Sequence, residues 1–250
     1  YRVAAEHFSD IGVPSLRFDY TGTGDALDFG DQAPSLEIWK NSIRAAASKL
    51  KTLSGCSQII VVGQGLGGTL AHLTGHTIEG VDSIVLLAPV LSGRGHLREI
   101  NMWSRIIHAD LGLGKEHAQS ARVQIAGLTL PDTIAAEIGK LNIGSPQELA
   151  APNYLVLERP ARVDDTSFAD ALKALGGNVE QRVFEGYDEL VDSFRYIEEA
   201  NRSFTDVYGT MNSDQAVAVL QRIEQTMETI RTALHIQRED FDRNAARERA

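Results

Sequence analysis

A buried strand that runs directly into a glycine-rich turn and a helix constrains this chain more than any other feature. Residues 58–68 read Gln-Ile-Ile-Val-Val-Gly-Gln-Gly-Leu-Gly-Gly, and an apolar helical pattern follows. Two kinds of site share this strand–turn–helix arrangement. As G-x-S-x-G, the segment is a nucleophile turn in which Gly65 occupies the position of the serine. As G-x-G-x-x-G, its glycines match a dinucleotide-binding turn.

The dinucleotide interpretation has the right glycines, Gly63, Gly65 and Gly68, but it lacks an acidic residue. An Asp or Glu that binds the ribose should close the next strand, roughly 20 residues further on. That strand ends Leu-Leu-Ala-Pro at residues 86–89, without a carboxylate. A complete strand–helix unit also precedes the turn, whereas the fingerprint usually opens its domain. A Rossmann-type dinucleotide-binding protein is therefore the less favoured alternative.

The rest of the chain alternates apolar strands with helices, which is typical of a parallel sheet covered by helices. Predicted strands are residues 14–20, 58–62, 83–87, 154–158 and 181–184. Predicted helices are residues 2–10, 36–53, 66–74, 168–175 and 214–234, with Ser213 as the N-cap of the last. We expect the strand at 58–62 to be central in the sheet, with 14–20 and 83–87 as its neighbours.

The rhythm of strands and helices is interrupted once, which predicts an inserted segment. We expect residues 1–95 and 151–235 to form the α/β core and residues 96–150 to form a helical cap without a convincing strand. Residues 236–250 read as a polar tail. Because the chain opens on what looks like the middle of a helix, we expect a fragment that lacks the N-terminal strands of the core.

Three segments resemble a branch of the α/β-hydrolase superfamily. Residues 16–25 (Leu-Arg-Phe-Asp-Tyr-Thr-Gly-Thr-Gly-Asp) resemble the strand and turn before the nucleophile turn of many such proteins. Residues 88–99 are similar to the P-V-x-S-G-R-x-x-L-R-E stretch of bacterial serine-aminopeptidase-like hydrolases encoded near exosortase and exopolysaccharide genes, and residues 126–138 resemble their cap. The resemblance spans residues 2–190. It implies an α/β-hydrolase fold and an ancestry in ester, amide or thioester hydrolysis, in a branch whose nucleophile turn often lacks serine.

The standard catalytic triad is incomplete in this sequence. Gly65 has no hydroxyl, so no covalent acyl-enzyme can form there. Asp164 or Asp165 follows the strand at 154–158, at the position of the acid, but the loop at 185–190 has no histidine. We expect a noncatalytic protein that binds a ligand or a partner. The alternative is a hydrolase that uses a carboxylate-activated water, with Asp164, Asp165 or Asp188 as the base.

Ligand-binding candidates lie where strands end, because open α/β sheets bind ligands at the carboxyl ends of their strands. These candidates are Gln64, Leu66, Asp19, Ser92 and Asp188. We expect a small acyl or carbohydrate-related ligand. Two of the candidates have simpler interpretations: Asp19 would hold the glycine turn through backbone hydrogen bonds, and Ser92 would cap the next helix.

Composition excludes several classes of function. The net charge is −10 and no basic stripe of the kind that binds nucleic acid is evident from the sequence, so we expect no nucleic-acid partner. The lone Cys56 excludes a disulfide framework within the chain, and His72 and His76 lack an evident third ligand, so we expect no metal and no cofactor. The longest apolar run, residues 84–91, is too short to span a bilayer, and we expect a bacterial cytoplasmic protein.

Overall fold

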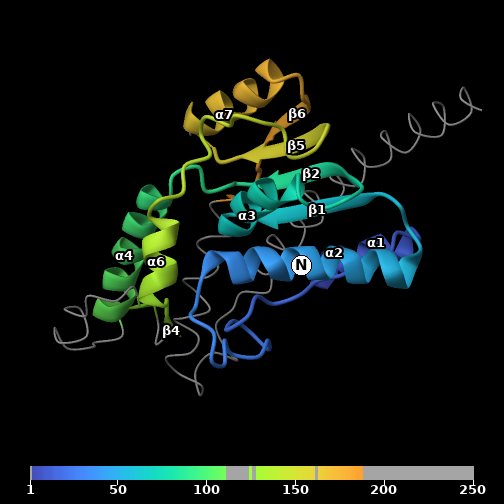
Figure 1. Ribbon diagram of the computed structural model, residues 1–250. Coiled ribbons are helices and arrows are strands. Elements are labelled where there is room, and N and C mark those ends of the chain that lie inside the picture. The colour runs from blue at the N-terminus through green and yellow to red at the C-terminus, as the bar shows by residue number, and fades with distance from the viewer. Residues whose placement is uncertain (1, 111–123, 126–127, 161–162, 188–250) are drawn as a thin grey trace, which may run out of the picture. The chain divides into compact units, whose positions relative to one another are not determined.

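The computed structural model describes residues 2–110, 124–125, 128–160 and 163–187. Its centre is a four-stranded sheet in the order β1-β2-β5-β6 (Figure 1). The strands are β1 (Ile59–Gln64), β2 (Val81–Leu87), β5 (Asn153–Glu158) and β6 (Asn178–Val183). β2 is parallel to both β1 and β5, with Val62 opposite Val85 and Val85 opposite Leu155. The predicted parallel α/β architecture is therefore confirmed.

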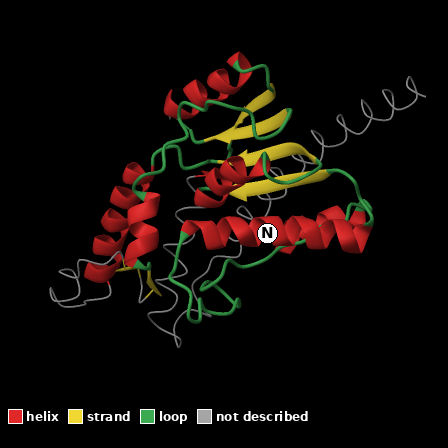
Figure 2. Ribbon diagram, viewed as in Figure 1, coloured by secondary structure: helices red, strands yellow, loops and turns green. Residues whose placement is uncertain are grey.

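Helices lie beside the strands of the sheet (Figure 2). α3 (Leu66–Gly75) and α7 (Val163–Ala174) pack on the same face of the sheet, because Ala71, Phe168 and Leu172 form one buried cluster with Ile84 and Val156. That cluster follows the alternation of side chains along β2 and β5, in which every second residue shares a face. α1 (Arg2–Asp10) precedes the sheet.

α2 (Leu36–Ser54) shows how the sequence encodes a helix and its end. Leu36, Trp39 and Ile43 recur at helical spacing and are buried. The helix ends at Gly55, whose φ of 72° is left-handed and whose N–H donates a hydrogen bond to the Lys51 carbonyl oxygen. A glycine adopts this conformation without steric cost, as the sequence predicts.

The predicted strand at residues 14–20 is wrong. This segment is irregular and runs from α1 towards a glycine turn. β1 lies at the edge of the described sheet and has β2 as its strand neighbour (Figure 1). Residues 14–20 have strand-like composition, but a strand forms only by pairing its backbone, and in the described part of the chain no backbone hydrogen bond joins residues 14–19 to a strand. The expectation that residues 58–62 are central, between 14–20 and 83–87, fails for the same reason.

The described residues between β2 and β5 include two helices and a short strand pair. α4 (Gly93–Asp110) and α6 (Asp132–Ile138) overlap residues 96–150, where the sequence predicts a helical cap, and β3 (Gln124–Ile125) pairs antiparallel with β4 (Leu128–Thr129), although the sequence predicts no strand there. Each strand of this pair is only two residues long, which leaves little periodicity for a sequence pattern to reveal.

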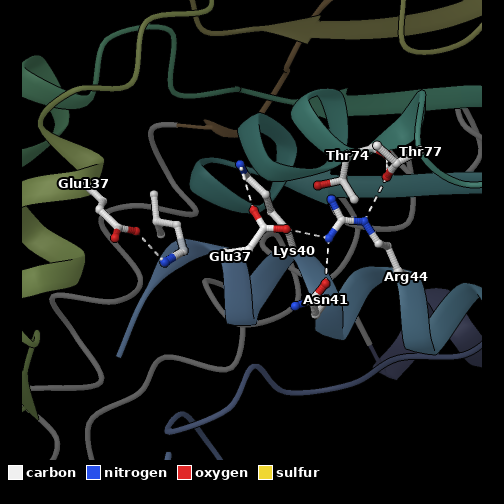
Figure 3. Close-up of polar contacts among 8 residues, drawn as sticks. Glu37, Lys40, Asn41, Arg44, Thr74, Thr77 and Glu137 are labelled. Carbon is white, nitrogen blue, oxygen red and sulfur yellow. Dashed lines mark hydrogen bonds and ion pairs between the residues drawn. The ribbon is translucent and has the colours of Figure 1, made fainter. Parts of the chain in front are cut away.

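α6 is anchored to the core and is not a loosely attached lid. Ile134 and Ile138 are fully buried in a cluster with Leu36 and Trp39 of α2. The Glu137 carboxylate accepts a hydrogen bond of 2.6 Å from the Leu36 N–H, at the start of α2 (Figure 3). Since the first N–H groups of a helix have no partner within the helix, a carboxylate from α6 satisfies a donor that Ser35, the N-cap residue, leaves free.

The chain divides into two compact units, residues 1–182 and residues 183–250. Of the second unit the structure describes residues 183–187, in which the rings of Phe184 and Tyr187 lie 5.6 Å apart. The predicted helix at 214–234 with its cap Ser213, and the tail at 236–250, lie outside the described residues.

Candidate functional site

The turn between β1 and α3 is the centre of the candidate site. Gly65 follows the last residue of β1 and has φ 54° and ψ −123°, outside the regions that residues with side chains populate readily. Its N–H donates to the Leu87 carbonyl oxygen at 2.9 Å, and its own carbonyl oxygen accepts from the Val90 N–H at 3.2 Å. A Cβ placed on Gly65 would meet no atom within 4 Å. The position therefore presents its side-chain direction to open space.

The other glycines of the turn have a packing role. A Cβ on Gly63 would lie 2.5 Å from the Gly67 carbonyl oxygen, and a Cβ on Gly68 would lie 2.9 Å from the Gly63 carbonyl oxygen. Only glycine allows strand and helix backbones to approach this closely. This close packing accounts for the G-x-G-x-x-G pattern without a bound dinucleotide.

The carboxyl ends of three strands meet beside this turn. Ala88, the residue after β2, donates its N–H to the Leu157 carbonyl oxygen of β5 at 2.8 Å. Ala88 is buried and has φ 47°, a left-handed conformation that is costly for a residue with a Cβ. The hydroxyl of buried Thr69 on α3 donates to the Val90 carbonyl oxygen at 2.7 Å. Backbone hydrogen bonds thus fix Gly65 against the end of β2, which is in turn bonded to β5 through Ala88.

Gln64 and Leu66 flank Gly65 but have different surroundings. Gln64 is half-buried at the end of β1. The Leu66 side chain packs against the apolar cluster that contains Leu36 and Trp39, so it belongs to the core. Of the two predicted ligand-binding residues, Leu66 has a packing role that the sequence pattern did not distinguish from a site role.

Asp19 holds a turn, as its simpler interpretation predicts. Its carboxylate accepts a hydrogen bond of 3.0 Å from the Asp25 N–H, and Gly24 has no room for a Cβ because the Asp19 carboxylate would lie 2.5 Å from it. The next residue, Tyr20, lies near α3: its hydroxyl would be 3.8 Å from a Cβ on Gly67, and its ring is 5.4 Å from that of Trp39. The glycine turn at 21–25 therefore stays close to the start of α3.

Ser92 caps α4, which confirms its simpler interpretation. Its hydroxyl oxygen accepts a hydrogen bond of 3.3 Å from the Gly95 N–H in the first turn of the helix. Ser92 is exposed and pairs through an isolated bridge with Asn142. The Ser92 carbonyl oxygen also accepts a hydrogen bond of 3.0 Å from the His96 N–H, whereas among the described residues no hydrogen bond joins the Ser92 hydroxyl to an imidazole.

His96 falls in the predicted cap, where the sequence predicts a solvated histidine. It lies one turn into α4 and is half-buried. Burial lowers its pKa because the charged imidazolium loses hydration; Glu99 opposes this shift, and Arg159 adds to it. Arg159, which contributes to this lowering, follows the end of β5.

Two of the three predicted acid positions fall within the described residues. Asp164 and Asp165 lie within the first turn of α7, and Asp188 lies outside the described residues. The buried carboxylate nearest the end of β5 is Glu158, which accepts a hydrogen bond of 2.7 Å from the Gln181 amide on β6. Its one sequence signal is its place as the last residue of an apolar strand, which the pattern alone does not mark as a site.

His72 and His76 face different partners. His72 is buried on α3, with its Nδ1 3.4 Å from the Tyr154 hydroxyl, and burial lowers its pKa to about 4. His76 lies 3.9 Å from a Glu148 carboxylate oxygen. Among the described residues, no group of three or more His, Cys, Asp or Glu side chains is placed to hold a metal ion.

A surface hollow of about 600 Å³ lies between α1, residues 13–17 and the end of α2. Its apolar lining includes Leu16, Leu50 and Leu53, and none of the predicted site residues lines it.

No helix in the described part of the chain has the length and apolar character needed to cross a membrane.

Comparison with known proteins identifies the fold. No protein-family model and no curated protein sequence matches the chain. Est1E from Butyrivibrio proteoclasticus, solved with ferulic acid bound, is 18% identical and aligns with a TM-score of 0.51 over 81% of this chain and 83% of its own. The alpha/beta hydrolase GrgF from Penicillium sp. sh18 is 12% identical, with a TM-score of 0.50 over 80% of this chain and 83% of its own. This chain, with its parallel sheet, its strand–turn–helix at Gly65 and its helices inserted after β2, has the α/β-hydrolase fold.

Proposed function

We propose that this protein descends from hydrolases and binds a ligand or a partner at the carboxyl edge of its sheet without serine-hydrolase catalysis. One observation carries the proposal. Gly65 stands at the sharp turn between β1 and α3, where its side-chain direction faces open space, and it supplies no oxygen there. Covalent hydrolysis needs an attacking oxygen at such a turn and a base beside it.

The backbone around Gly65 supports the weak binding of an anionic group such as a carboxylate or a phosphate. The first N–H groups of α3 lack partners within the helix, and the positive end of a helix dipole attracts carboxylates and phosphates. Gly65 itself leaves space where a serine side chain would stand. We therefore expect the carboxylate of a small acyl or carbohydrate-related ligand to bind weakly at this turn. Because residues 88–99 resemble the exosortase-associated branch, we also propose that the protein is bacterial and cytoplasmic.

The competing function is hydrolysis by a carboxylate-activated water. Asp164 and Asp165 lie in the first turn of α7, which follows β5, so they remain the acid candidates of that hypothesis, together with Asp188. This mechanism requires no serine. It predicts turnover of an ester without covalent labelling, which separates it from serine catalysis and from binding alone.

The catalytic question is tested with the purified protein, a fluorophosphonate probe and a 4-nitrophenyl ester. We expect no labelled peptide by mass spectrometry and no burst or steady release of nitrophenol. A labelled Ser92 would overturn the proposal and make that serine a nucleophile. Ester turnover without labelling, lost on substitution of Asp164 or Asp165 by Asn, would overturn it in favour of the activated water.

The binding question is tested by calorimetry with octanoate, using Gly65→Ala and Gly65→Trp as a matched pair. Both variants place a Cβ on the same strained backbone, so a difference between them reports occupied space. We expect weak octanoate binding by wild type and Gly65→Ala, and none by Gly65→Trp. Equal binding by all three proteins, or no binding by wild type, would contradict a ligand site at Gly65.

A further inference from the structure

Three arginines form a stripe along one side of α4. Arg94, Arg98 and Arg105 are all exposed. At 3.6 residues per turn, their spacing places them within about 40° of one another around the helix axis. With a rise of 1.5 Å per residue, the stripe is about 16 Å long. The sequence, read without the helix boundaries, does not show that these three side chains share a face.

The side chains of this stripe have no partner among the described residues. There, no side-chain hydrogen bond or ion pair involves Arg94, Arg98 or Arg105. Two other cations have acidic neighbours: half-buried Arg44 lies 2.7 Å from Glu37, and exposed Lys173 lies 3.1 Å from Asp170. In a chain of net charge −10, an unpaired row of three guanidinium groups is a local reversal of charge.

The remaining faces of α4 argue against a membrane as the partner. A helix that lies on a lipid surface needs an exposed apolar face. On α4, Leu97 packs against the buried cluster around Trp39, and Ser104 is buried. Among the described side chains of the helix, Met102 is the most exposed large apolar one, with an exposed fraction of 53%.

We propose that α4 is a docking surface for an acidic helix of a partner protein. Guanidinium groups pair with carboxylates through charge-assisted hydrogen bonds. A row about 16 Å long is too extended for one phosphate, but it matches carboxylates repeated along the face of another helix. Because α4 begins directly after Ser92, the Arg94 end of the stripe lies near the residues that follow β2. This surface does not depend on the function proposed for Gly65.

The test uses a fluorescein-labelled alanine-based helical peptide whose glutamates have the same four- and seven-residue spacing as the arginines. The test variant is Arg94→Gln/Arg98→Gln/Arg105→Gln. The matched control, Arg17→Gln/Lys49→Gln/Lys140→Gln, also removes three exposed positive charges. By fluorescence anisotropy at low ionic strength, we expect wild type and control to bind within twofold of each other and the test variant at least tenfold more weakly, a difference of about 1.4 kcal/mol. Binding by wild type should weaken as salt is added.

Several results would overturn the proposal. A peptide that fails to bind wild type, or that binds both triple variants equally, shows that the stripe is only a solvated face. Wild-type binding to phosphatidylglycerol vesicles that the test variant loses would make the surface a membrane contact. Competition by inorganic phosphate as effective as by the peptide would make it an anion site. Both variants should melt like wild type, since the substituted side chains are exposed.

Discussion

Substitution of Gly65 by alanine tests whether the turn after β1 is strained. The φ of 54° with ψ −123° lies outside the left-handed region that residues other than glycine occasionally visit. An added Cβ would meet no neighbouring atom within 4 Å, so the penalty comes from backbone conformation and not from a clash. Such conformations cost about 1–3 kcal/mol each for a residue with a side chain.

The net effect is smaller than the strain. Glycine-to-alanine substitution also restricts the unfolded chain, which stabilises the folded state by about 0.4–1 kcal/mol. Combining the two ranges gives a loss in the free energy of unfolding of about 0–2.6 kcal/mol, and we expect Gly65→Ala to lie near the middle, at about 1.3 kcal/mol. In a protein of this size, that loss lowers the melting temperature by roughly 3–5 °C.

Gly55→Ala is the matched control for this prediction. Gly55 also has positive φ and would have no atom within 4 Å of an added Cβ, but its ψ of 5° lies nearer the ordinary left-handed region. Urea unfolding of both variants, followed by circular dichroism, measures the two costs. The reasoning is refuted if Gly65→Ala is as stable as wild type, or if it is less harmful than Gly55→Ala.

Three further predictions concern burial, capping and the glycine turn. Burial lowers the pKa of His72 from 6.5 to about 4, so the unfolded chain takes up a proton at this histidine at a higher pH than the folded protein does. Between pH 7 and pH 5 this difference should lower the free energy of unfolding by about 2 kcal/mol. Urea titrations at the two pH values should show a smaller loss for His72→Gln than for wild type. Glu137→Ala removes the acceptor for the Leu36 N–H and should lower the free energy of unfolding by about 1–2 kcal/mol. Glu137→Gln keeps an acceptor oxygen and should lose less stability. Equal melting temperatures for the two variants would contradict the capping role. NAD and FAD should not bind tightly, because Ala88 stands where a ribose-binding acid is needed. Calorimetry measures this binding. A dissociation constant of about 1 μM or below, with binding abolished by Gly65→Trp, would support the dinucleotide alternative.

Local signals in the sequence predict local structure well. Gly55 ends α2, Ser92 caps α4, and Asp19 binds the backbone of the turn that follows it, because each of these roles depends on neighbours a few residues away. The positive φ of Gly65 is predictable for the same reason: a strand that enters a helix through a sharp turn needs an unusual backbone angle.

Features that depend on distant segments are not predictable in this way. Residues 14–20 have the composition of a strand, but composition does not supply a neighbour to pair with. The burial of Glu158 depends on Gln181, which is 23 positions away, and the capping of α2 depends on Glu137, which is 101 positions from Leu36. Asp164 and Asp165 lie in the first turn of α7, a boundary that the periodicity places later, at Phe168.

The edge of the described sheet has a consequence for how this protein behaves in concentrated solution. β1 carries no charged residue and no proline, which are the usual safeguards of an edge strand, and Ile60 and Val62 are 36% and 37% exposed. A strand of this kind can pair with the same strand of another molecule, so we expect association that grows with protein concentration. Val62→Lys places a charge on the exposed face and should shift light scattering towards the monomer; unchanged scattering would mean that this edge does not mediate self-association.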